Sequence, residues 1–128
     1  MRTQDLWASL EAQPFPLLHE LTPMDRDGFV LLDAYLRTCL EEWYASGSQL
    51  SARSVVLLDD CARSVTKRFR LLDGEGQYYF GQFRLLARRI LHSLDVDQAK
   101  RELAADPDPA NVFENPNAEW EKVLANEW

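Results

Sequence analysis

The sequence predicts an all-α fold: an antiparallel helical bundle of three long helices, with short N- and C-terminal helices packed on it. Proline is absent between residues 24 and 106, and helix interiors exclude proline because it removes a backbone donor and clashes with the preceding turn. Within that span, apolar residues recur at alternating steps of three and four, the spacing of one helix face. The 128 residues correspond to one domain. We expect a polar linker at 106–117 and a C-terminal helix or tail at 118–128.

The first expected element is a short amphipathic helix from Thr3 to Gln13. Its apolar residues Leu6, Trp7 and Leu10 share one face. The helix is expected to end before Pro14, where two closely spaced prolines favour an extended connection.

The first long helix is expected at residues 22–46. Thr22, Pro23 and Asp25 supply a capping hydroxyl, a proline at the first helical position and an acid in the first turn. One apolar stripe follows, formed by Phe29, Leu32, Leu36, Cys39 and Trp43. Gly47 is expected to end this helix.

Two further long helices are expected at residues 51–72 and 77–94, joined by a tight turn at 73–76. The former carries the most regular stripe in the chain, formed by Val55, Leu58, Ala62, Val65, Phe69 and Leu72. The latter has a broad apolar face, formed by Tyr79, Phe80, Phe83, Leu86, Ala87, Ile90, Leu91 and Leu94. A face this broad indicates contact with at least two other elements. Gly81 costs about 1 kcal/mol relative to alanine in a helix, so a closely packed neighbouring backbone is expected there.

Two short helices complete the expected fold. One covers residues 97–105, with Asp95 or Asp97 as its cap. The other follows Asn117 and places Trp120 on its apolar face.

The net charge of −7 is unevenly distributed. Residues 52–92 carry eight basic and four acidic side chains, whereas the segments on either side are strongly acidic. The basic middle either neutralises the acidic ends within the fold or binds an anionic partner. For the second case, the candidate anion-binding residues are Lys67, Arg70, Arg84 and Arg88. A small helical nucleic-acid-binding or regulatory protein would use them, although the acidic total makes nucleic acid an unfavourable partner.

Cys39 and Cys61 are too few for a disulfide scaffold. Both occupy apolar positions of expected helices, so two small buried thiols are expected. The alternative is a single disulfide bridge between neighbouring helices. The N-terminal residues do not resemble a secretory signal, and no apolar stretch approaches the roughly 20 residues that span a bilayer. We therefore expect a cytoplasmic protein with reduced thiols.

No catalytic, metal-binding or cofactor-binding motif is found in the chain. His19 and His92 have no further ligands at helical spacing, and no phosphate-binding glycine loop is present. We therefore expect a protein that is not an enzyme, without a metal or cofactor. An enzyme or ligand-binding bundle with Tyr78 and Tyr79 at the mouth of a pocket remains an alternative.

The favoured function is a non-enzymatic protein-binding module. One form is an acidic inhibitor, of the immunity or antitoxin type, that masks a basic partner protein. The candidate partner-binding residues are Asp33, Glu41, Glu42, Trp120 and Trp128, because tryptophan is common at binding hot spots. The alternative is a homo-oligomeric scaffolding protein that packs through the broad face of residues 77–94 or through the C-terminal tail.

Overall fold

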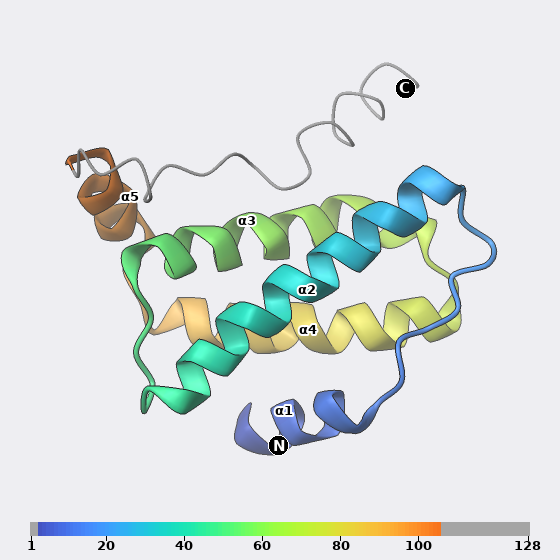
Figure 1. Ribbon diagram of the computed structural model, residues 1–128, viewed down its shortest axis with the longest axis horizontal. Helices are drawn as coiled ribbons and strands as arrows, with labels where there is room; N and C mark the ends of the chain where they lie inside the picture. Colours follow the sequence, from blue (N-terminus) through green and yellow to red (C-terminus); the bar gives the residue numbers. More distant parts are fainter. Residues whose placement is uncertain (1–2, 106–128) are drawn as a thin grey trace.

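The computed structural model describes residues 3–105; residues 1–2 and 106–128 lie outside that description (Figure 1). Every regular element of the described part is a helix and none is a strand, which confirms the expected all-α class. Its elements are α1 (Thr3–Ala12), α2 (Pro23–Ala45), α3 (Ala52–Arg68), the 3-10 helix η1 (Phe69–Leu71), α4 (Gly74–His92) and α5 (Val96–Ala105). The expected C-terminal helix and the linker at 106–117 lie outside the described residues.

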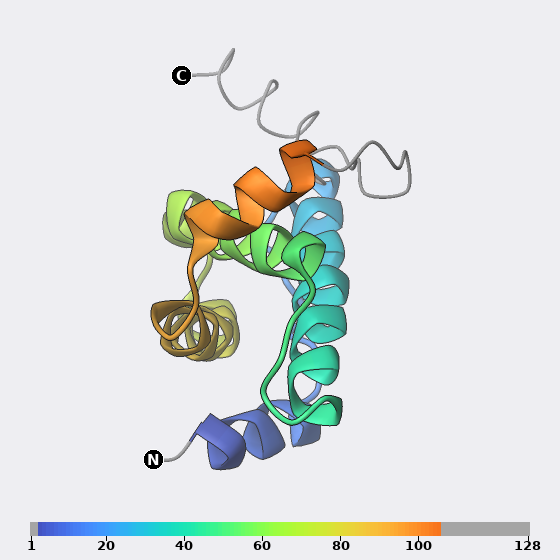
Figure 2. The same ribbon diagram turned by 90° about the vertical axis from the view of Figure 1, so that its left-hand side faces the viewer.

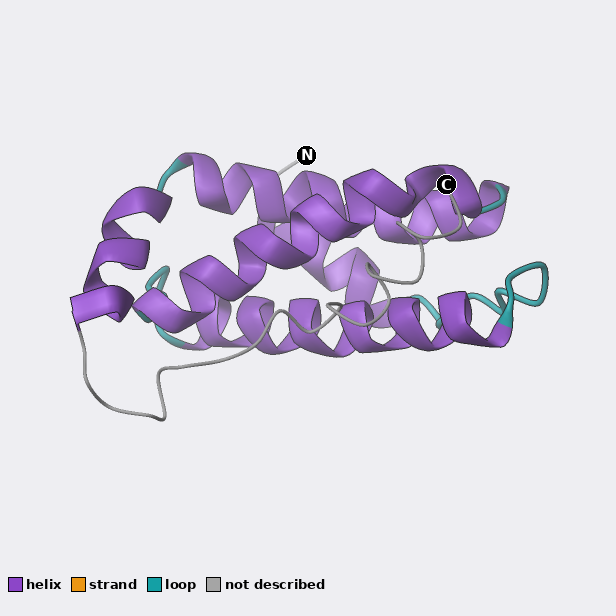
Figure 3. Cartoon of the chain, turned by 90° about the horizontal axis from the view of Figure 1, so that it is seen from above, coloured by secondary structure: helices purple, strands orange, loops and turns teal. Residues whose placement is uncertain are grey.

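Helix α3 lies at the centre of the packing, in contact with α2, α4 and α5. Helix α1 packs against α4, and in Figure 2 α1 and α5 lie at opposite ends of the molecule. Figure 1 shows α2 crossing α3 and α4 obliquely, and Figure 3 shows the helices from above. The five helices therefore pack against one another, while the antiparallel alignment of three long helices stays a prediction.

Side-chain caps start the long helices. Thr22 Oγ1 accepts from the Asp25 amide at 3.2 Å, as expected from the sequence. Ser51 Oγ caps α3 in the same way, at 3.2 Å from the Ser54 amide. Asp73 Oδ1 accepts from the Gly76 amide at 3.2 Å. The expected turn at 73–76 was therefore wrong. With Asp73 as the N-cap, Gly74 and Gly76 lie in the first turn of α4 instead of before it.

The apolar stripes predicted from the sequence form the core. Its largest fully buried side chains include Phe29, Phe80 and Phe83, and the broad face of α4 is buried within the chain. The expectation for Gly81 was wrong, because a Cβ there would meet the Phe69 ring at 3.6 Å instead of a backbone. The close approach lies at Gly76, where a Cβ would be 3.0 Å from Leu72 Cδ2.

Both cysteines are buried and free. The alternative of a disulfide bridge between them was therefore wrong. Burial raises the pKa of Cys39 to about 12, and the nearby Glu42 carboxylate adds to the effect. Burial also raises the pKa of Cys61 well above its ordinary value. The two thiols are therefore protonated core residues at neutral pH.

Candidate binding surfaces

Helix α2 has a second regular stripe, on the side that solvent reaches. Positions 24, 27, 31, 34, 38 and 41 alternate in steps of three and four, and every one is exposed. With the neighbouring Val30, they form the α2 outer face: Met24, Asp27, Val30, Leu31, Ala34, Thr38 and Glu41. Met24, Val30 and Leu31 are 47, 49 and 37% exposed. Three large apolar side chains are therefore exposed on this one helix.

The α2 outer face is acidic because the basic residues of α2 are engaged elsewhere. The helix contains five acidic and two basic residues. Arg26 Nε donates to the Leu18 carbonyl at 3.3 Å, and Arg37 donates to side chains of α2 and α4. Asp27 and Glu41 thus remain as the charged groups of the α2 outer face.

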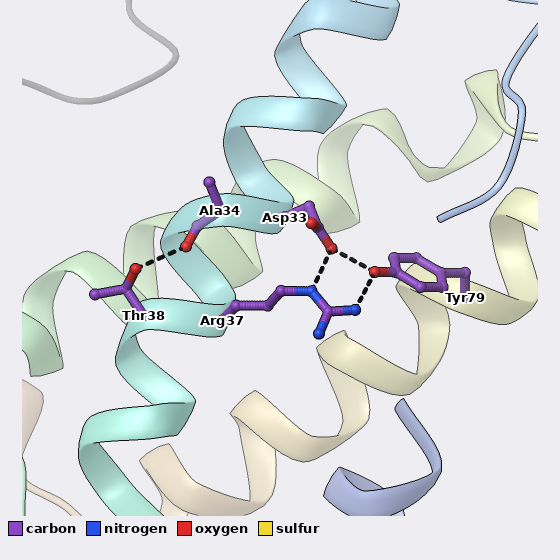
Figure 4. Close-up of polar contacts among 5 residues, drawn as sticks. All are labelled: Asp33, Ala34, Arg37, Thr38 and Tyr79. Carbon is purple, nitrogen blue, oxygen red and sulfur yellow. Dashed lines mark hydrogen bonds and ion pairs between the residues drawn. The ribbon is translucent and has the colours of Figure 1, made fainter. Parts of the chain in front are cut away.

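Asp33, Arg37 and Tyr79 form a hydrogen-bonded network that joins α2 to α4 (Figure 4). The Tyr79 hydroxyl donates to Asp33 Oδ1 at 2.5 Å and accepts from an Arg37 terminal nitrogen at 2.6 Å. Arg37 Nε also pairs with Asp33 Oδ1 at 3.2 Å. Burial raises the pKa of Tyr79 to about 12; the bond to Asp33 also raises this pKa and Arg37 lowers it. The network ties α2 to α4 through these three side chains and has a structural role.

The predicted partner-binding residues are therefore separated. Asp33 takes part in the network between α2 and α4, and Glu41 lies on the α2 outer face. Glu42 is half-buried, and its Oε1 accepts from the Ser51 amide at 3.4 Å, next to the start of α3. Trp120 and Trp128 lie outside the described residues.

Sequence reasoning missed the apolar part of the α2 outer face. Met24, Val30 and Leu31 lie outside the first apolar stripe of this helix, which runs from Phe29 to Trp43. A second stripe at the same spacing, offset from the core stripe, was the available signal. Only burial separates the two stripes into inner and outer faces.

The candidate anion-binding residues are also divided by the structure. Lys67 and Arg88 line one groove of about 680 Å³ between α3 and α4, together with Arg63 and His92. Arg84 does not line it; its guanidinium lies 4.3 Å above the centre of the Phe69 ring. Arg70 belongs to η1 and does not line the groove either.

Tyr78 and Tyr79, the two residues of the alternative pocket, differ in their exposure. Tyr79 is buried, Tyr78 is 65% exposed, and neither lines the groove between α3 and α4. Among residues 3–105, no three His, Cys, Asp or Glu side chains come together as a metal site. Within the same residues, no helix combines the length and the apolar character that a membrane span requires.

No protein-family model, curated protein or solved structure matches this chain. Among residues 3–105, the candidate binding surfaces are the α2 outer face and the groove between α3 and α4.

Proposed function

We propose that the protein is a non-enzymatic binding module that attaches to a basic partner protein through the α2 outer face. The observation that carries this proposal is the exposure of Met24, Val30 and Leu31 on one helix face that also carries Asp27 and Glu41. An acidic inhibitor of the immunity or antitoxin type, acting in the cytoplasm, is the form of this proposal that the surface fits best.

The apolar residues supply the affinity. From Met24 to Glu41 the α2 outer face extends for about 25 Å at 1.5 Å per residue. Side chains at such spacing are the anchors by which a helix binds in the groove of another protein. Full burial of one of them is worth about 1.5–3 kcal/mol. Since each is already half covered, we expect about 1 kcal/mol from each on docking.

The acidic residues select the partner. Asp27 and Glu41 stand near the two ends of the α2 outer face, and both arginines of α2 are engaged inside the chain. Opposite charge on the partner accelerates encounter and fixes its orientation. A second copy of this chain would bring the same acids together, so self-association through this face is disfavoured.

Affinity capture from a lysate of the native host tests the proposal. The baits are the full chain and the variants Leu31→Asp and Glu41→Lys, with Leu85→Asp as the matched control. Leu85 is exposed to a similar extent, but on α4. The expected result is a basic protein that the full chain and the control retain, that both α2 variants lose, and that added salt releases.

Two outcomes would contradict the proposal. One is a captured set that all four baits share. The other is a concentration-dependent dimer in light scattering that Leu31→Asp abolishes, because the α2 outer face would then be a contact between copies of this chain.

A further inference from the structure

The groove between α3 and α4 brings basic side chains together from both of its walls. Arg63 and Lys67 are four residues apart on α3, and Arg88 and His92 are four residues apart on α4. Residues at this spacing are neighbours on one helix face, with their Cβ atoms about 6 Å apart. Each wall therefore presents two nitrogen-bearing groups to the same space of about 680 Å³.

Little negative charge opposes these groups. Asp59 is the one acid among the described residues that line the groove, and its Oδ2 lies 3.2 Å from Arg63 Nε. Among residues 3–105, neither Lys67 nor Arg88 has an ion-pair partner. The groove therefore keeps a net positive charge that comes from both helices.

The remaining lining residues restrict the ligand. Ala62 and Leu91 contribute an apolar part, and Thr66 adds a hydroxyl. The described residues that line the groove include no Trp, Tyr or Phe, and such rings are the platforms on which the bases of single-stranded nucleic acids stack. The lining therefore suits the binding of a charged group better than the stacking of a nucleic-acid base.

We propose that the groove between α3 and α4 is a binding site for an oligophosphate, either free or as the phosphate chain of a nucleotide. Arginine pairs with phosphate oxygens through two parallel hydrogen bonds, and lysine contacts them as a point charge. Because nitrogen-bearing groups line both walls of the groove, a chain of phosphates can contact both walls, whereas one orthophosphate contacts only part of the set.

The groove lining is positive although the chain as a whole is acidic. Residues 3–105 contain twelve basic and fifteen acidic side chains, a net charge of −3. Among these residues, the groove lining carries Arg63, Lys67 and Arg88 against the carboxylate of Asp59. The lining itself therefore presents a positive charge to a ligand.

Isothermal titration of the full chain tests the site, in magnesium-free buffer at 0.1 M salt. The probes are inorganic phosphate, tripolyphosphate, ATP, poly-glutamate and a single-stranded oligonucleotide. We expect tripolyphosphate and ATP to bind with similar affinity and inorganic phosphate to bind at least tenfold more weakly. Lys67→Ala and Arg88→Gln should each weaken tripolyphosphate binding about tenfold, the effect of losing one charged hydrogen bond.

Lys100→Ala is the matched control, because Lys100 is an exposed lysine of α5 that does not line the groove. It should change tripolyphosphate binding less than twofold. Lys67 and Arg88 are also exposed, so their variants should keep the helical circular-dichroism spectrum of the parent. Absence of tripolyphosphate binding, equal loss in Lys67→Ala and Lys100→Ala, or tighter binding of poly-glutamate or the oligonucleotide would each overturn the proposal.

Discussion

Replacing Tyr79 by phenylalanine should destabilise the fold through a single oxygen atom. The Tyr79 hydroxyl donates to Asp33 at 2.5 Å and accepts from Arg37 at 2.6 Å. The Tyr79 ring is buried. Both partners are charged, and a hydrogen bond to a charged group contributes about 1.5–3 kcal/mol. The substitution removes both bonds while the ring keeps its packing against Phe83.

The expected loss is smaller than the sum of two such bonds. Asp33 and Arg37 still pair with each other at 3.2 Å, and their side chains are 18 and 27% exposed. Water can therefore replace part of what the hydroxyl supplied. We expect the free energy of unfolding to fall by about 2 kcal/mol.

Urea unfolding at pH 7, followed by circular dichroism, measures this loss. Tyr78→Phe is the matched control, because its hydroxyl belongs to a ring that is 65% exposed, and it should change the free energy of unfolding by less than about 0.5 kcal/mol. A loss for Tyr79→Phe as small as that of the control would refute the assignment of a stabilising role to the network.

The pH dependence supplies a second measurement of the same residue. The pKa of Tyr79 is raised from 10.0 to about 12 by folding, mainly through burial. A phenol with a raised pKa contributes stability that is fully present below pH 10 and is lost as the pH rises through about 12. The stability difference between the parent and Tyr79→Phe should therefore shrink above pH 10. A difference that stays constant up to pH 12 would contradict this reasoning.

Three further predictions concern the core. Gly76→Ala should lower the free energy of unfolding by about 1 kcal/mol, because the new methyl group would lie 3.0 Å from buried Leu72; an unchanged urea midpoint would contradict this. Gly81→Ala should raise it by up to about 1 kcal/mol, since the contact with Phe69 at 3.6 Å is ordinary and alanine favours the helix; a lowered melting temperature would count against it. Buried Cys61 should react with a thiol reagent only in denaturant. A fast reaction of the native protein would contradict the burial of this thiol.

Helix capping and apolar spacing could be predicted from the sequence because both are local. The Thr22 cap joins atoms three residues apart, and the core stripe from Phe29 to Trp43 follows from the helical period. The start of α4 was misplaced because the local signal is ambiguous at this point. Asp73 can begin either a turn or a helix, and the choice depends on the packing of Gly76 against the core.

The helical class and the core stripes could be predicted from the sequence alone, because the helical period converts spacing along the chain into one buried face. The roles of the polar residues became clear only from the packing of the helices. Asp33 is tied to Tyr79, which lies 46 positions along the chain, while Glu41 on the same helix stays in solvent. Lys67 and Arg88 likewise share a groove only because α3 packs against α4. Such pairings depend on how the helices pack against one another. The spacing of residues within one helix does not specify them.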